Sequence, residues 1–70
     1  MAERRFRALV ADDEPMARDA VRTLLAAQPA VEVVGEASSG DETVAAVRRL
    51  RPDLLFLDVQ MPGGDGFAAL

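Results

Sequence analysis

The sequence predicts an α/β fold in which helices cover the faces of a parallel β-sheet. Two short apolar runs without polar alternation, residues 8–11 and 54–57, are typical of strands that are buried on both sides. Two segments with apolar residues at three- and four-residue spacing lie between these runs, and a third strand-like stretch separates them. Strands that alternate with helices favour a parallel sheet joined by right-handed crossovers.

The first two elements are a strand over residues 6–11 and an amphipathic helix that begins at Pro15. Proline suits the first helical position, because the N–H that it lacks would have no partner there. Gln28-Pro29 is expected to end the helix. The apolar side is formed by Met16, Ala17, Ala20, Val21, Leu24 and Leu25. The polar side is formed by Arg18, Asp19, Arg22 and Thr23.

A second strand is expected over residues 31–37. Glu32 and Glu36 lie on the same face of it. Charged residues inside a strand suit the edge of a sheet, where they discourage further pairing. We therefore expect this strand to lie at an edge.

The remaining elements are a second helix, a third strand and the start of a third helix. Ser39 and Glu42 have the spacing of a capping box, which predicts that a helix begins there. The helix should end before Pro52, and its apolar positions are Val44, Ala45, Val47 and Leu50. A strand over 54–57 follows, and residues 67–70 are expected to begin a third helix.

The composition is that of one small globular domain or of part of one. The chain has 70 residues, of which 50% are hydrophobic and 29% charged. The net charge of −4 argues against a nucleic-acid-binding face. Residues 3–7 are locally basic, and we interpret their arginines as a solvated lead-in to the first strand.

The missing residue types exclude several functional classes. The chain has no cysteine and no histidine, which excludes disulfides, thiolate metal sites and catalysis by an imidazole of its own. No apolar run is long enough to span a membrane, and the first residues lack the pattern of a signal peptide. We therefore expect a cytoplasmic protein that contacts no membrane.

Carboxylates follow both of the most apolar strands. Asp12 and Asp13 come after the first, and Asp58 comes after the third. Ligands bind beyond the carboxyl ends of the strands in open α/β sheets, so these three acids would converge if the two strands are neighbours. Mg²⁺ would relieve their mutual repulsion. Such a site suits phosphoryl transfer, in which an aspartate can itself be the nucleophile.

Other interpretations of these acids remain open. Asp12 or Asp13 could cap the first helix, and Asp58 could belong to an ordinary turn. A P-loop NTPase also has an aspartate after an apolar strand, but it needs a lysine, and all eight basic residues here are arginine. Haloacid-dehalogenase-like phosphatases place a second aspartate two residues after the nucleophile, where this chain has Gln60.

Two motifs together resemble the receiver domain of two-component response regulators. The first is Ala-Leu-Val-Ala-Asp-Asp-Glu-Pro at residues 8–15; the second, at residues 58–66, matches the family pattern D-x-x-M-P-x-x-D-G at every fixed position. The resemblance implies a flavodoxin-like, doubly wound sheet of strand order 2-1-3-4-5. The elements up to the start of the third helix would give the order 2-1-3, with residues 1–70 as the N-terminal part of a single receiver domain.

The resemblance also implies a role for each matching residue. Asp58 would be the phosphoacceptor, taking its phosphoryl group from a sensor histidine kinase. Mg²⁺ would be held by Asp12, Asp13, Asp58 and the main-chain carbonyl of Gln60. The loop would be shaped by Met61, Pro62, Gly63, Gly64, Asp65 and Gly66. The chain would thus be a signalling domain and not an enzyme, controlling a transcriptional output domain that looks most like the LytTR type.

Two family features have no counterpart in the 70 residues, namely the switch hydroxyl after the fourth strand and the lysine after the fifth. We therefore expect weak metal binding without efficient switching. The strand over 54–57 should also lie at an edge, where it can template association. We expect self-association through this strand or through bare helix faces. Two alternatives are a receiver-like interaction module without phosphoryl chemistry and part of a Mg²⁺-dependent phosphohydrolase.

Overall fold

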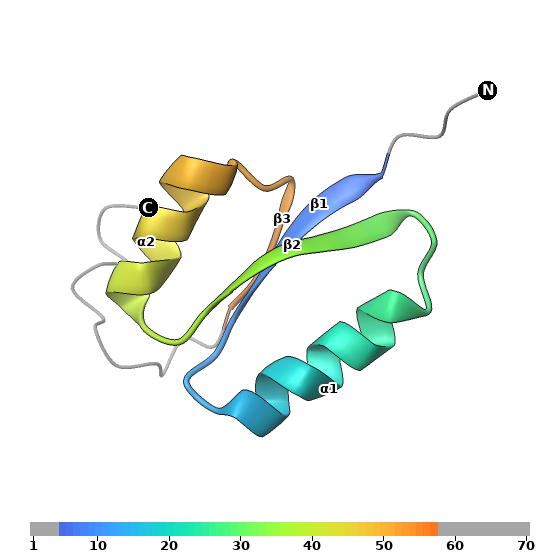
Figure 1. The fold of residues 1–70 in the computed structure, drawn as a ribbon, viewed down its shortest axis with the longest axis horizontal. Helices are drawn as coiled ribbons and strands as arrows, with labels where there is room; N and C mark the ends of the chain where they lie inside the picture. Colours follow the sequence, from blue (N-terminus) through green and yellow to red (C-terminus); the bar gives the residue numbers. More distant parts are fainter. Residues whose placement is uncertain (1–4, 58–70) are drawn as a thin grey trace.

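The computed structural model describes residues 5–57, which form a three-stranded parallel sheet with one helix on each side (Figure 1). In chain order the elements are β1 (Phe6–Ala11), α1 (Pro15–Ala26), β2 (Val31–Ala37), α2 (Gly40–Leu50) and β3 (Leu54–Leu57). All five agree with the elements that the sequence predicts, and the predicted start of a third helix lies outside the described residues. Neither of the two helices is long and apolar enough to cross a membrane.

The sheet has the strand order β2-β1-β3, as predicted, with β1 in the middle. The pairing with β3 runs without interruption from Ala8–Leu54 to Ala11–Leu57. The pairing with β2 shifts between Ala8 and Leu9. The prediction that β2 lies at an edge is thus confirmed for the described part of the sheet.

The core is built around β1. Its residues Ala8, Leu9, Val10 and Ala11 are at most 2% exposed, because strands flank β1 on both sides and helices pack on its faces. The sequence also predicts that β3 is buried on both sides, and this prediction is wrong within the described residues. Leu54, Leu55 and Phe56 are 36–38% exposed, because β3 contacts only β1 among the described elements.

Helix α1 covers one face of the sheet, but it is rotated relative to the prediction. Met16 and Leu24 were assigned to its apolar face and are 83% and 71% exposed. The positions that turn inward are Ala17, Arg18, Val21 and Leu25, all of intermediate exposure. Arg18 was assigned to the polar face, and it lies partly covered because its guanidinium has partners in two other segments.

Helix α2 begins with a modified capping box. The hydroxyl of Ser39 accepts a hydrogen bond from the Glu42 N–H at 3.1 Å, as predicted. The Glu42 carboxylate, however, accepts from the N–H and the hydroxyl of Ser38, both at 2.8 Å, instead of from the N–H of Ser39. Both serines therefore fix the start of this helix.

The buried side of α2 also differs from the prediction by one position. Ala45 is exposed, whereas Ala46 and Thr43 are buried. A threonine is tolerated there because its hydroxyl donates to the carbonyl oxygen of Ser39 at 2.7 Å. The helix ends at Leu50, before Pro52 as predicted, and Arg51 adopts a left-handed conformation with a φ of 49°.

The basic residues before and within β1 are not simply a solvated lead-in. Arg7 Nη1 donates to the main-chain oxygens of Leu50 and Arg51, which lie at the carboxyl end of α2. Arg5 Nη2 donates to the carbonyl oxygen of Val31 at 3.0 Å. A cation at a helix C-terminus is favourable because unpaired carbonyls there carry partial negative charge. These arginines therefore fasten β1 to α2 and β2.

Candidate functional site

The candidate site begins in the loop between β1 and α1. The N–H of Asp12 donates to the carbonyl oxygen of Ala37 at 3.0 Å, which extends the pairing of β1 with β2. Its Oδ1 accepts a hydrogen bond from the N–H of Glu14 at 3.0 Å. The N-cap of α1 is Glu14, without a capping side chain. The alternative that Asp12 or Asp13 caps this helix is therefore wrong, and the Asp12 carboxylate instead braces its own loop.

The two acids keep uncommitted oxygen atoms. Within residues 5–57, Asp12 Oδ2 accepts no hydrogen bond, and neither does the carboxylate of Asp13, which is exposed. Carboxylate oxygens are the ligands that hard cations such as Mg²⁺ prefer. The donor set that these two residues offer thus fits a divalent cation.

The end of β3 lies beside the end of β1. Ala11 pairs with Leu57, so the last residues of the two strands are neighbours at one end of the sheet. In the sequence, Asp12 follows the first of them and Asp58 follows the second. Asp58 and the rest of the predicted site, namely Gln60, Met61, Pro62, Gly63, Gly64, Asp65 and Gly66, lie outside the described residues. Within the described ones, no three acidic, cysteine or histidine side chains are grouped closely enough to hold a metal ion.

A small cavity lies at this end of the sheet. It has a volume of about 240 Å³ and is lined by Val10, Ala11, Asp12, Val21, Phe56 and Leu57. Its walls are apolar apart from Asp12. A larger cavity of about 430 Å³ lies between α1 and β2, with Arg5, Arg22 and Glu32 in its wall, and is away from Asp12 and Asp13. The smaller one is therefore the cavity that belongs to the candidate site.

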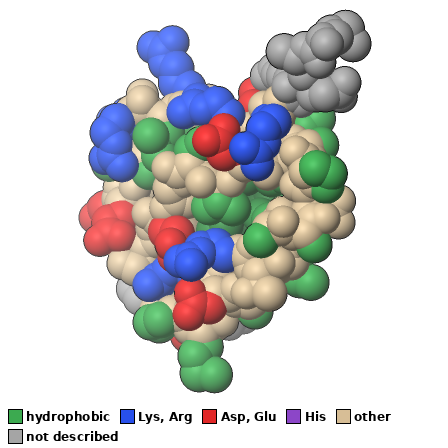
Figure 2. Space-filling view, turned by 45° about the vertical axis from the view of Figure 1, so that its right-hand side comes forward, with side chains coloured by type: hydrophobic (Ala, Val, Ile, Leu, Met, Phe, Trp, Pro, Cys, Tyr) green, Lys and Arg blue, Asp and Glu red, His purple; other side chains and the backbone are tan. Residues whose placement is uncertain are grey.

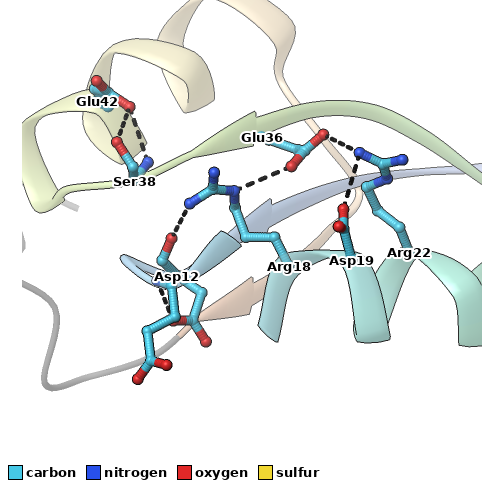
Figure 3. A network of polar contacts seen from close by, with 8 residues as sticks. Asp12, Arg18, Asp19, Arg22, Glu36, Ser38 and Glu42 are labelled. Atoms are coloured by element: carbon cyan, nitrogen blue, oxygen red, sulfur yellow. Dashed lines mark hydrogen bonds and ion pairs between the residues drawn. The ribbon is translucent and has the colours of Figure 1, made fainter. Parts of the chain in front are cut away.

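Ion pairs connect helix α1 to strand β2 at the edge of the sheet. Arg18 Nε lies 3.1 Å from Glu36 Oε1, and Arg22 Nη1 lies 2.7 Å from Glu36 Oε2 (Figure 3). On the same helix, Asp19 Oδ1 lies 3.6 Å from Arg22 Nη1. On the face shown in Figure 2, acidic and basic side chains likewise adjoin one another instead of forming a patch of one sign.

The two arginine partners of Glu36 stabilise its ionised form. The hydrogen bond from Arg22 lowers the pKa of Glu36 most, the bond from Arg18 lowers it further, and partial desolvation opposes both. Glu36 in turn raises the pKa of Arg22. Sequence reasoning missed this network. A usable signal was present, because Arg18 and Arg22 lie one helical turn apart and an acid occurs on the strand that follows.

The comparison with known families identifies one match. Residues 8–70 match the family described as the response regulator receiver domain. The chain is 52% identical over 57 residues to the transcriptional regulatory protein BtsR of Escherichia coli K12. The matched segment covers 81% of this chain and 24% of BtsR. It is also 49% identical over 64 residues to protein-glutamate methylesterase/protein-glutamine glutaminase 4 of Myxococcus xanthus. That match covers 91% of this chain and 18% of the relative.

Solved structures show the same fold. The signal receiver domain of NarL from Mycobacterium tuberculosis superimposes with a TM-score of 0.83 at 37% identity, over 86% of this chain and 48% of the other. The response regulator domain of CheB from Thermotoga maritima gives a TM-score of 0.82 at 37% identity, over 84% and 44%. The chain spans about a quarter of BtsR and less than half of either receiver structure.

Proposed function

Because the chain belongs to the response regulator receiver domain family, we propose that Asp58 is its phosphoacceptor. The observation that carries this proposal is the register of β1 and β3. Ala11 pairs with Leu57, and in the sequence Asp12 and Asp13 follow the first of these residues and Asp58 follows the second. The match over residues 8–70 supports the further proposal that residues 1–70 are the N-terminal part of a single receiver domain.

The phosphoryl donor would be a phosphohistidine of a sensor histidine kinase. A carboxylate oxygen of Asp58 attacks the phosphorus atom, a P–O bond forms, and the P–N bond to the kinase histidine breaks. The product is an acyl phosphate on Asp58. The chain acts here as an acceptor in signal transduction and turns over no substrate of its own.

Mg²⁺ would be held by the carboxylates of Asp12, Asp13 and Asp58 and by the main-chain carbonyl of Gln60. When bound, it neutralises charge on the oxygens of the incoming phosphoryl group. The donor set supports this assignment, because Asp12 Oδ2 and the Asp13 carboxylate are uncommitted within the described residues. The residues from Met61 to Gly66 would shape the loop after the phosphoacceptor.

The output of the domain is proposed from its relatives. BtsR is named as a transcriptional regulatory protein, and NarL is named as a response regulator. We infer that this chain likewise controls a transcriptional output domain, which would place it in the cytoplasm. That the output domain is of the LytTR type stays a prediction.

We propose that switching on phosphorylation needs residues other than the 70 of this chain. The 70 residues include no lysine, whereas receiver domains use one after their fifth strand to contact the phosphoryl group. A polypeptide of these residues alone should therefore bind Mg²⁺ weakly and become phosphorylated inefficiently. The full-length protein is accordingly the sample in which to test Asp58.

The exposed side chains of β3 support a second proposal, in which the 70-residue chain associates with itself. Leu54, Leu55 and Phe56 are 36–38% exposed, and β3 pairs with no described strand other than β1. Light scattering over a range of concentrations should show oligomers that decrease when Leu55 is replaced by lysine. A monomer at all concentrations would contradict the association. An interaction module without phosphoryl chemistry is the alternative function, and it predicts association without Mg²⁺ binding.

The metal site can be tested by NMR. In the ¹⁵N-labelled chain, the amide signals of Asp13 and Glu14 should shift with Mg²⁺ and saturate, and Asp13→Asn should weaken binding strongly because it removes a ligand charge. Asp41→Asn is the matched control, because Asp41 is an exposed acid in the first turn of α2. If Asp13→Asn and Asp41→Asn change the Mg²⁺ affinity equally, the proposed ligand role of Asp13 is wrong.

A further inference from the structure

We propose that Arg18 is a positioning residue that holds the Asp12–Asp13 peptide in place for metal binding. This inference rests on the proposed function, because it takes these two acids as Mg²⁺ ligands. Arg18 itself carries no ligand atom for a cation. It would act through the loop, by fastening that loop to α1 and to β2.

The guanidinium of Arg18 bridges two segments that are far apart in the sequence. Nη1 donates to the main-chain oxygen of Asp12 at 2.7 Å, and Nε donates to Glu36 Oε1 at 3.1 Å (Figure 3). The Arg18 side chain is only 19% exposed. An arginine suits this position because its planar, delocalised guanidinium presents several donors in a fixed geometry.

The acceptor atom on Asp12 explains why this contact matters for the site. The carbonyl oxygen of Asp12 belongs to the planar peptide that joins Asp12 to Asp13. Rotation of that peptide would change the directions in which both carboxylates leave the chain. The Asp12 N–H donates to the carbonyl oxygen of Ala37, and Asp12 Oδ1 accepts from the N–H of Glu14. The bond from Arg18 completes this set, because it fixes the one remaining main-chain group of Asp12.

Glu36 has an electrostatic part in the same arrangement. A lone arginine beside a cation site would repel the cation, and the Glu36 carboxylate offsets that charge. Glu36 is held in turn by Arg22 Nη1 at 2.7 Å. Arg22 therefore shares the acidic partner of Arg18 but makes no hydrogen bond to Asp12, and its other ion-pair partner is Asp19 on the same helix.

This difference provides a matched pair of variants, Arg18→Gln and Arg22→Gln. Each removes one positive charge and one ion pair with Glu36, and only the first removes the hydrogen bond to Asp12. The full chain is titrated with Mg²⁺ alone and followed by ¹⁵N NMR, because the sequence has no tryptophan or tyrosine for a fluorescence titration. Amide hydrogen exchange of Asp13 and Glu14 is measured in parallel without metal.

Arg18→Gln should weaken Mg²⁺ binding roughly tenfold, which is the lower end for partners that orient metal ligands. It should also speed the exchange of the Asp13 and Glu14 amides. Arg22→Gln should change the affinity much less. Arg18→Lys should fall in between, because its ammonium is a point charge on a flexible stem and does not reproduce the fork of donors.

Equal loss of Mg²⁺ affinity in Arg18→Gln and Arg22→Gln would overturn the inference, because the shared loss of charge would then explain both. Unchanged amide exchange in Arg18→Gln would overturn it as well. If Arg18→Gln does not fold, the comparison of Arg18→Lys with Arg22→Lys decides in the same way. Should the unmodified chain bind no Mg²⁺, the proposed function fails, while the exchange measurement still decides whether Arg18 orders the loop.

Discussion

Arg7 and Asp53 exchange two hydrogen bonds across the start of β1 and β3. The Arg7 N–H donates to Asp53 Oδ2 at 2.8 Å, and the Asp53 N–H donates to the Arg7 carbonyl oxygen at 2.7 Å. This pair directly precedes the Ala8–Leu54 pair of the sheet. It therefore helps to fix the register that brings Ala11 beside Leu57, the residue that precedes Asp58 in the sequence.

Replacing Asp53 by alanine should lower the free energy of unfolding by about 1 kcal/mol, because the Arg7 N–H loses its side-chain acceptor. Asp53→Asn keeps an acceptor oxygen and should lose less. Urea denaturation followed by circular dichroism measures both. If the asparagine variant is as unstable as the alanine variant, the charge of Asp53 matters and not its hydrogen bond to Arg7.

Gly35 is required by the close approach of α2 to β2. A Cβ at this position would lie 2.6 Å from Leu50 Cδ1 and 3.4 Å from Leu9 Cδ1. Leu50 must therefore move in Gly35→Ala, and we expect a loss of about 1 kcal/mol, typical of mild overpacking.

The partner substitution provides the control for Gly35. Valine at position 50 lacks the Cδ1 atom, so the double variant Gly35→Ala/Leu50→Val should be more stable than the sum of the two single effects predicts. Thermal denaturation of the four proteins gives the coupling. Strict additivity would show that Leu50 does not set the requirement for glycine.

Acid should destabilise the fold through Glu36 and Glu42. The pKa of Glu36 is lowered mainly by its hydrogen bond from Arg22, and the pKa of Glu42 mainly by the N–H of Ser38. Both carboxylates then bind fewer protons in the folded chain than in the unfolded chain. Their contribution is fully present above the ordinary pKa of 4.5 and is lost as the pH falls below it.

Urea denaturation across this range of pH tests the acid dependence. The unmodified chain should lose stability steadily below pH 4.5. Glu36→Gln and Glu42→Gln should each start from a lower stability at neutral pH and show a shallower decline. A variant that declines as steeply as the unmodified chain would show that its carboxylate does not take part.

Much of the fold could be predicted because local signals and the global fold agree. Apolar runs, the proline at the start of α1 and the serine before α2 each indicate the element that forms there. The complete strand order, by contrast, followed from the family resemblance, and the charges of β2 alone indicated only that this strand lies at an edge. Helix periodicity alone could not predict which face of α1 turns inward. Arg18 is partly covered because it has two hydrogen-bond partners, and Met16 is exposed instead.

The sequence suggests which acids form the candidate site, and their role stays a prediction, but it does not reveal the contacts that hold these acids in place. Aspartates after two apolar strands suggest a cation site by their type and place. The bond from Arg18 to Asp12 involves a main-chain oxygen, which has no signature in the sequence. The modified capping box illustrates the same limit, since the spacing predicts Ser39 as the partner of the Glu42 carboxylate, and Ser38 takes that place in the structure.

The most direct test of the account is phosphorylation of the full-length protein with acetyl phosphate and Mg²⁺, followed by mass spectrometry of its peptides. The account predicts one acid-labile phosphoryl adduct on the peptide that contains Asp58, which depends on Mg²⁺ and disappears in Asp58→Asn. An adduct that survives in Asp58→Asn, or no adduct in the unmodified protein with Mg²⁺ present, would contradict the assignment of Asp58 as the phosphoacceptor.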